Sequence, residues 1–289
     1  MHPRSFGRFF LPLIGGLLIA GCSTLKLAYN NADFVGTWIA DSHFDLTSVQ
    51  KKELDASLER ILEWHRREEL PNLIRWLENA KSELDHGLTV AAIDSFFKQA
   101  QLRYETFIDM SADEGTVFFK GLTDEQITHL EDKSRKDSAE FVEDHLLNRS
   151  LEQRKARRWE RTRKFLKDWI GNLSDEQETE FSKMSYALPM TQSLWFENRI
   201  RRRKEFVTLL RTKRNSPEFK QVLVEWFKDS NKSPSIEYET AVREMMNRSF
   251  KMAVDISSRL SEKQKERALK RLQGYIDDLK ALHKRAGTE

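Results

Sequence analysis

The chain has 289 residues, of which 39% are hydrophobic and 33% charged, a composition typical of a folded protein with one large or two ordinary domains. Beyond position 21 it contains only seven glycines and four prolines, which disfavours turn-rich β architectures and favours long helices. Its single cysteine, Cys22, excludes an intrachain disulfide framework and a multi-thiolate metal site.

The first 21 residues have the pattern of a secretory signal. Arg4 and Arg8 stand in an opening without acidic residues, and an apolar run from Phe9 to Ile19 follows. This run is too short to serve as a mature membrane anchor, which needs about 20 residues. We therefore predict a signal peptide over residues 1–21 and leave it out of the fold.

The residues around Cys22 indicate a lipid anchor. The stretch Leu18-Ile19-Ala20-Gly21-Cys22 resembles the bacterial lipoprotein signal, which implies that Cys22 is diacylated on sulfur, becomes the new N-terminus and is acylated again. Several acyl chains make membrane attachment effectively stable. Ser23 is similar to the residue after the cysteine in lipoproteins sorted to the outer membrane, which implies a position on its periplasmic face. The alternative is a plain secretory signal whose Cys22 is cut away or stays free.

Apolar side chains recur at helical spacing along the mature chain, and no segment alternates with a period of two. In chain order, these helical segments cover residues 54–62, 73–77, 93–107, 222–227, 242–254 and 272–279. The pattern predicts an all-α protein, an elongated multi-helix bundle of about seven or eight helices. We expect a lipidated N-terminus with a first short helix over residues 22–44 and a helical domain over 45–289, with a possible sub-boundary near 171–174 or 215–217.

Glycine and proline mark the expected helix ends. The predicted C-terminal stops are Gly87, Gly121 and Gly171. The predicted helix starts, each a cap followed by a first-turn proline, are Ser216-Pro217 and Ser233-Pro234. The prolines expected to kink or restart a helix are Pro71 and Pro189.

One five-residue pattern, Leu-(Ser/Thr)-x-x-Gln, occurs four times, at residues 46–50, 122–126, 173–177 and 260–264. In each copy the hydroxyl residue is predicted to be the N-cap of a helix, and the glutamine the third helical residue that completes a capping box. The eight predicted capping residues are Thr47, Gln50, Thr123, Gln126, Ser174, Gln177, Ser261 and Gln264. The copies are too unevenly spaced for a solenoid repeat.

Two interpretations of the pattern remain open. The simpler is four independent capping boxes, because local capping explains every position of the motif. The pattern also resembles the Leu-Thr-x-x-Gln motifs of small periplasmic stress chaperones, which form helical cradles around unfolded clients. That resemblance covers five residues per copy and implies a class of function only.

A wider resemblance appears near the mature N-terminus. The stretches Cys22 to Asn31, Phe44-Asp45-Leu46 and Trp64 to Pro71 look like a family of proteobacterial lipoproteins known only as a domain of unknown function. The motifs span about residues 18 to 77, and membership implies an envelope location without supplying an activity. Asn30, Asn31 and the segment from Trp64 to Pro71 are the first candidates for mutation, with a structural role favoured.

Charge is distributed unevenly along the chain. Residues 23–148 carry a net charge of −11, residues 149–214 one of +9, and residues 215–289 one of +3. The basic part contains two dense stretches, 154–164 and 199–204. The aromatic residues near them, expected in the core, are Trp159, Phe165, Trp169, Trp195 and Phe206.

The basic stretches have three possible roles. Pairing with the acidic helices or simple solvation is favoured, because charge runs on long helices are usually of this kind. Contact with anionic lipid headgroups or lipopolysaccharide phosphates is the alternative. The candidate residues for that contact are Arg157, Arg158, Arg161, Arg201, Arg202 and Arg203. Nucleic acid is not expected as a partner behind a secretory signal.

Catalytic and metal-binding patterns are absent from the sequence. It contains no Gly-x-Ser-x-Gly elbow, no His-Glu-x-x-His and no glycine-rich phosphate loop. The single Glu-x-x-His, Glu83 to His86, lacks the partners that a di-iron bundle needs. We therefore predict no catalytic, cofactor or metal site, and no enzyme.

The favoured function is that of a tethered, non-catalytic helical module of the cell envelope. Its expected partners are the membrane, through acylated Cys22, and an unknown envelope protein or unfolded client. The alternatives are a module that contacts anionic lipid or lipopolysaccharide and a steric chaperone of one secreted enzyme.

Overall fold

The computed structural model describes residues 22–229, 232–233 and 235–285, so the predicted signal peptide lies outside the described residues. The prediction of an all-α multi-helix bundle is confirmed, since the described part of the chain is helical and contains no strand. It holds eleven helices when α4, η1 and α5 are counted as one continuous helix, somewhat more than the seven or eight expected. None of these described helices is long and apolar enough to cross a bilayer.

The first half of the chain comprises α2 (Cys22–Asn30), α3 (Ala32–Phe44), α4 (Ser48–Trp64), η1 (His65–Glu69), α5 (Leu70–His86), α6 (Val90–Lys120) and α7 (Asp124–Asp144). The second half comprises α8 (Leu151–Ile170), α9 (Asp175–Ala187), α10 (Gln192–Lys213), α11 (Phe219–Lys228), α12 (Ile236–Ser258) and α13 (Glu262–Arg285). Residues 22–44 therefore form two helices where one short helix was expected.

Most of the predicted helix ends are found where the sequence places them. Gly87, Gly121 and Gly171 are the C-caps of α5, α6 and α8, which confirms these stops. Gly87 and Gly171 have positive φ angles of 118° and 84°, a conformation that glycine adopts without the steric cost of a Cβ atom.

Two predicted helix starts are wrong by about two residues. Helix α11 begins at Phe219 with Glu218 as its N-cap, after the Ser216-Pro217 pair. Helix α12 is capped by Ser235, whose hydroxyl accepts a hydrogen bond from the Tyr238 amide, and not by Ser233. Pro234 lies outside the described residues. A serine and a proline mark a turn, but several positions within such a turn can supply the cap.

Pro71 widens its helix without ending it. Proline has no N–H to donate, and its ring collides with the carbonyl four residues before it. The chain relieves this conflict through the π-helical segment η1, in which the Leu70 amide donates to the His65 carbonyl, five residues back. Pro189, in contrast, separates two helices, because α9 ends at Ala187 and α10 begins at Gln192.

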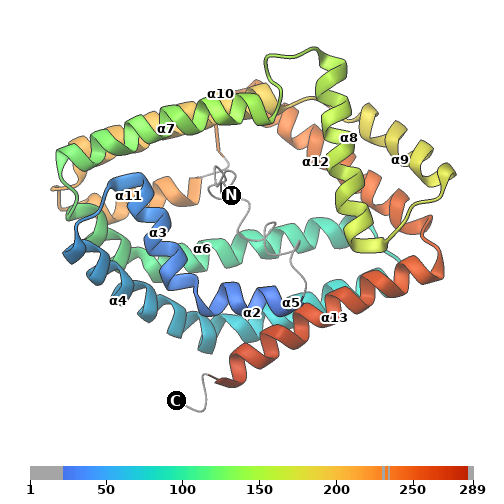
Figure 1. Ribbon diagram of the computed structural model, residues 1–289, viewed down its shortest axis with the longest axis horizontal. Coiled ribbons are helices and arrows are strands. Elements are labelled where there is room, and N and C mark those ends of the chain that lie inside the picture. Colours follow the sequence, from blue (N-terminus) through green and yellow to red (C-terminus); the bar gives the residue numbers. More distant parts are fainter. Residues whose placement is uncertain (1–21, 230–231, 234, 286–289) are drawn as a thin grey trace.

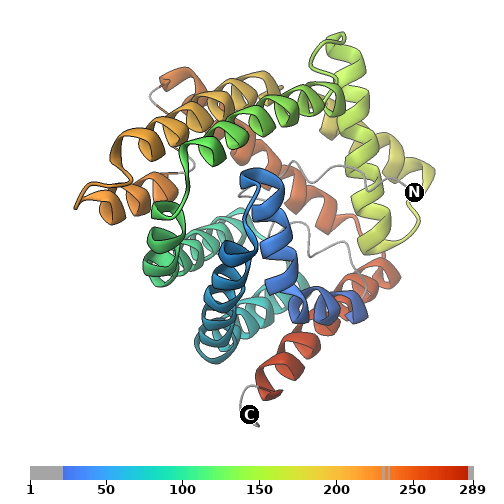
Figure 2. The ribbon, with the colours of Figure 1, turned by 60° about the vertical axis from the view of Figure 1, so that its left-hand side comes forward.

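The helices are arranged as an open frame (Figure 1). Helices α7 and α10 pack side by side along one edge, α8 and α9 along the next, and α5 with α13 along the edge opposite α7. Figure 2 shows the same frame turned, with α3 and α4 side by side on the remaining edge.

The first two Leu-(Ser/Thr)-x-x-Gln motifs meet in space, through reciprocal hydrogen bonds between their glutamines. Gln50 Nε2 donates to Gln126 Oε1 at 3.0 Å, and Gln126 Nε2 donates to Gln50 Oε1 at 2.8 Å. Each Nε2 also donates to the carbonyl just before the other motif, Gln50 to Gly121 and Gln126 to Asp45. We call this contact the first junction.

The third and fourth motifs form a second junction with the same bonds. The amides of Gln177 and Gln264 donate to each other at 2.8 and 2.9 Å. Gln177 also donates to the Arg259 carbonyl and Gln264 to the Asn172 carbonyl, again the residues just before the partner motif. Each glutamine Oε1 accepts as well from its own N-cap backbone N–H, so all four hydrogen-bonding positions of every amide are used.

Apolar side chains pack around both junctions. The leucines of the first junction, Leu46 and Leu122, are buried in one core cluster, and the leucines of the second, Leu173 and Leu260, belong to or pack on another. The residue four positions after each glutamine joins the same cluster: Leu54 and Leu130 at the first junction, Phe181 and Ala268 at the second. The repeated unit is therefore longer than the five-residue motif.

The helices around the two junctions contact one another in the same order. Helix α3 packs on α4 and α7, and α4 packs on α6; correspondingly, α8 packs on α9 and α13, and α9 packs on α12. The motifs initiate α4, α7, α9 and α13 through capping boxes. The expectation that the four boxes act independently is wrong, because they form two pairs.

A fifth capping box shows what the pairing requires. Ser150 and Gln153 form a complete box at the start of α8, but Arg149 replaces the leucine and Arg157 the apolar residue four positions after the glutamine. Gln153 is exposed and bonds only within its own box in the hydrogen bonds described. It serves as a natural control for the paired glutamines.

The pairing predicts that glutamate cannot replace the paired glutamines. A capping box accepts either residue, but a carboxylate has no N–H to donate to the partner amide and carbonyl. Gln126→Glu and Gln264→Glu should each lower the free energy of unfolding in urea by about 2 kcal/mol, because buried acceptors lose their donors. Gln153→Glu should change it by less than about 0.5 kcal/mol. Equal effects at the three positions would contradict the account.

Candidate functional site

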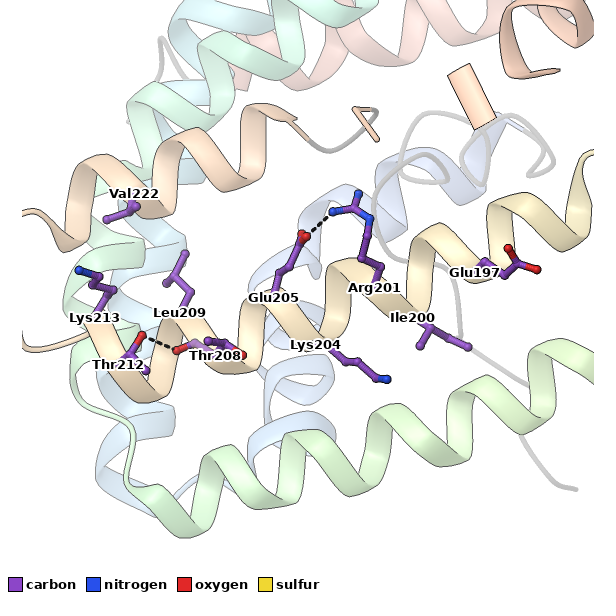
Figure 3. Close-up of a pocket in the computed structure, with 10 residues that line it drawn as sticks. All are labelled: Glu197, Ile200, Arg201, Lys204, Glu205, Thr208, Leu209, Thr212, Lys213 and Val222. Carbon is purple, nitrogen blue, oxygen red and sulfur yellow. Dashed lines mark hydrogen bonds and ion pairs between the residues drawn. The ribbon is translucent and has the colours of Figure 1, made fainter. Parts of the chain in front are cut away.

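One concave feature of the described residues is an open groove along α10, with a volume of about 680 Å³. Its walls come from residues spaced three or four apart on one face of that helix, and Val222 of α11 closes one end (Figure 3). The lining side chains of α10 run from Glu197 to Lys213. At 1.5 Å per residue this is about 24 Å of helix.

The groove exists because α10 buries its other face. Val207 and Leu210 lie in the first core cluster, where Phe219 and Leu223 of α11 are also buried. The helix therefore turns Thr208 and the residues in line with it toward solvent.

The groove combines an apolar floor with charges of both signs. Its exposed surface is mainly apolar, and its charged lining residues are Glu197, Arg201, Lys204, Glu205 and Lys213. A small-molecule pocket encloses most of its ligand, but this groove is open along its length. The shape and lining fit a polypeptide segment laid along α10, as in helix-in-groove recognition.

No grouping typical of a metal centre occurs in the described residues: no three histidine, cysteine, aspartate or glutamate side chains are placed to hold one ion. His86 at the end of α5 donates through Nδ1–H to the Ser82 carbonyl, 2.8 Å away, within its own helix. The groove itself contains no histidine or cysteine.

Arg158, one of the candidate lipid-contacting residues, closes the end of α9. Its guanidinium donates to the carbonyls of Ser185, Leu188 and Pro189 at 2.6, 3.0 and 2.8 Å. The last carbonyls of a helix lack the full set of intrahelical partners, and a cation is favourable at this end of the helix dipole. Burial lowers the pKa of Arg158.

Arg202 and Arg161 also bond to backbone carbonyls of other helices. Arg202 lies over the Trp226 ring, 4.1 Å from its centroid, and donates to the carbonyl of the same residue. Burial lowers its pKa. Arg161 donates to the Asp144 carbonyl at the end of α7, 2.7 Å away.

Arg203 belongs to a buried ionic cluster between α3, α7 and α10. It lies 3.8 Å from Asp137, whose other partners are His43 and Lys133. Burial alone would raise the pKa of Asp137, but the hydrogen bonds from His43 and Lys133 outweigh it and hold this pKa at about 2. Burial, together with nearby Arg199, lowers the pKa of Arg203 to about 10, so it stays charged at neutral pH.

The remaining two arginines pair within α8 and α10. Arg157 bonds to Glu160, and Arg201 bonds to Glu205 and Asn198. All six candidate arginines thus have partners within the chain, which supports internal pairing over contact with lipid phosphates. Of the aromatic residues expected in the core nearby, Phe165 and Trp195 are instead 47% and 39% exposed.

The structure brings together the two N-terminal motifs singled out in the sequence. The hydroxyl of Tyr29, next to Asn30 and Asn31, lies 2.7 Å from His65 Nδ1, and Arg66 lies over the Tyr29 ring. Asn30 and Arg66 also line a small polar pocket of about 250 Å³ with Asp33, Glu59 and Leu62. Asn31 donates to the Leu27 carbonyl at the end of α2, 2.7 Å away.

Side chains of η1 continue this network into the core. Glu69 is 3% exposed and pairs with Arg103 of α6 at 3.1 Å, while His283 of α13 lies 2.9 Å from the Arg66 carbonyl. The π-helical turn therefore places its polar side chains where α2, α6 and α13 meet it. These contacts give the segment from Trp64 to Pro71 a structural role, as favoured from the sequence.

Sequence reasoning did not find the groove. Arg201 was singled out among its lining residues, but as a lipid contact. The signal is weak because polar and charged residues surround α10 on most sides, and the groove depends on how α11 packs beside it.

Comparison with known protein families identifies the family of this chain. The model of a family of unknown function, DUF6279, matches residues 42–239, more than two thirds of the chain. The chain belongs to this family. The match covers the first three Leu-(Ser/Thr)-x-x-Gln motifs and the whole of α10, whereas Cys22, α2 and most of α3 precede it. No curated protein and no solved structure matches the chain.

His65 gives this DUF6279 protein a specific pH dependence. Burial lowers the pKa of His65 below its ordinary value of 6.5, with Glu69 opposing. The folded state therefore resists protonation more than the unfolded chain does, so stability is complete above pH 6.5 and falls as the pH drops through the folded pKa.

We expect the free energy of unfolding to decrease as the pH falls below about 6.5, and His65→Gln to flatten this part of the profile. His86→Gln, at an exposed position, is the matched control and should leave the profile unchanged. Urea titrations at several pH values measure the effect. If His65→Gln shows the same pH dependence of unfolding as the wild type, His65 is not the group responsible.

Proposed function

We propose that this protein is a membrane-tethered lipoprotein of the bacterial envelope that binds segments of other proteins and catalyses no reaction. Acylated Cys22 would attach it to the periplasmic face of the outer membrane. The partner would lie along the groove of α10 as an extended or helical segment.

The groove along α10 is the observation that carries the binding role. It is open, about 680 Å³ in volume and largely apolar, and it extends along one helix. Lys204, Lys213 and Glu197 beside the apolar floor would pair with either sign of charge on the bound segment, whereas Glu205 is already paired with Arg201. These features favour a broad range of polypeptide partners over one enclosed substrate.

The repeated motifs support the same class of function. They resemble the motifs of periplasmic chaperones with helical cradles, and here they pair to hold open the frame on which α10 lies. Contact with lipid phosphates receives less support, because the candidate arginines are paired within the chain.

The binding role predicts that the purified chain slows aggregation of an unfolded protein. With chemically reduced α-lactalbumin as the probe, light scattering should fall when the full chain is added at an equal molar amount. The double variant Ile200→Asp and Thr208→Asp, which puts two charges on the groove floor, should lose this effect. Thr179→Asp, at an exposed position of α9, should keep it. No suppression by the unaltered chain would overturn the proposal.

The anchor predicts a second outcome. In cells that process lipoproteins, Cys22→Ser should leave residue 22 unacylated and move the chain out of the detergent phase, or leave an uncleaved precursor. Mass spectrometry of the N-terminal peptide and detergent partitioning measure this. The anchor would be refuted if Cys22→Ser partitions like the unaltered chain and residue 22 of the unaltered chain is unmodified.

A further inference from the structure

Helices α2 and α3 expose an apolar stripe to solvent. Leu27, Phe34, Val35 and Trp38 are 65%, 70%, 38% and 48% exposed. Phe34, Val35 and Trp38 share one face of α3, and Leu27 is exposed on α2, just before the turn at Asn31 that joins the two helices. The exposed positions between Leu27 and Phe34 are the uncharged Ala28, Asn30 and Asn31, and Asp33 beside Phe34 is only half-buried.

The opposite side of the same helices is packed. Leu25 is 5% exposed in the cluster that α13 and α5 build, with Tyr29 beside it. Gly36 of α3 meets Leu58 of α4 so closely that a Cβ atom would lie 2.8 Å from its side chain. Thr37 bonds to Asp55 of α4. The two helices are therefore held firmly, and their outward side is fixed.

The stripe begins next to the proposed lipid attachment point. Helix α2 starts at Cys22 itself, and Leu25 in the core is three residues later, about 4.5 Å along the helix. No linker separates the anchor from the folded body. If Cys22 carries acyl chains, the outward side of α2 is held within a few ångströms of the bilayer.

We propose that the exposed stripe of α2 and α3 is a membrane-docking surface that inserts between the lipid headgroups beside the acylated cysteine. The inference rests on the proposed lipid anchor and adds to it a defined orientation of the body. Aromatic and aliphatic side chains on one side of a helix lying in the membrane plane are typical of interfacial helices. The stripe would lie flat on the bilayer and hold the frame at a fixed angle to it.

A bilayer explains the stripe better than a protein partner does. A protein-binding surface of this kind could face any direction, whereas these side chains start within two turns of the residue that would enter the membrane. Lys26, on the same turn as Leu27, is held by Asp278 at 3.1 Å and so does not place an unpaired positive charge at the stripe. The expected occupant is therefore the interior edge of the headgroup layer and not an anionic phosphate.

The test measures the depth of one stripe residue in a membrane. The full chain, purified from the membranes of cells that process lipoproteins, carries Phe34→Cys, labelled with the fluorophore NBD, and is reconstituted in vesicles of phosphatidylethanolamine and phosphatidylglycerol. If Cys22 is acylated, the new cysteine is the sole free thiol. Ile236→Cys, 75% exposed on a helix that packs on α6, α9 and α10, is the matched control.

Lipids with a nitroxide near the headgroup should at least halve the NBD emission at position 34 and leave that at position 236 unchanged. Equal quenching at the two positions, or none at position 34, would overturn the docking surface. The mass of the N-terminal peptide, measured on the same sample, reports separately whether Cys22 is acylated. An unmodified Cys22, which NBD would also label, would refute the acyl anchor and the docking surface that rests on it, whereas an acylated Cys22 with no quenching at position 34 would refute the docking surface alone.

Discussion

Two reciprocal glutamine pairs organise this protein. A primary amide has two N–H donors and an oxygen that accepts two hydrogen bonds, so two glutamines can satisfy each other and still bond to backbone groups on both sides. Gln50 and Gln126 do this across 76 residues of sequence, and Gln177 and Gln264 across 87. Each pair joins the starts of two helices and orders the apolar clusters beneath them.

The junctions explain how so open a bundle stays ordered. Each fixes four helices at a shared corner, and between the corners the helices pack in pairs, such as α7 on α10 and α5 on α13. Arginines then close exposed helix ends, as Arg158 does for α9. Apolar surface stays exposed to solvent in the groove of α10 and on the stripe of α2 and α3.

Local signals in the sequence predict where the helices begin and end, but they do not predict which helices contact each other. The helix starts at Thr47, Thr123, Ser174 and Ser261 follow from capping chemistry, because every bond involved lies within four residues. Which glutamines pair is a tertiary property. One sequence signal is available. Each of the four paired motifs has an apolar residue before the cap and a second apolar residue four positions after its glutamine. The unpaired capping box at Ser150 lacks both of these apolar residues. The backbone carbonyls to which the arginines donate likewise depend on which helix ends lie nearby in the fold.

A double-mutant cycle tests the central role of the pairs most directly. The free energy of unfolding is measured for Gln50→Ala, Gln126→Ala and the double variant, with Gln50→Ala and Gln264→Ala, from different junctions, as the reference cycle. The account predicts a coupling energy of at least about 1 kcal/mol within the junction and additivity within about 0.5 kcal/mol across junctions. Additive effects of Gln50→Ala and Gln126→Ala would contradict it.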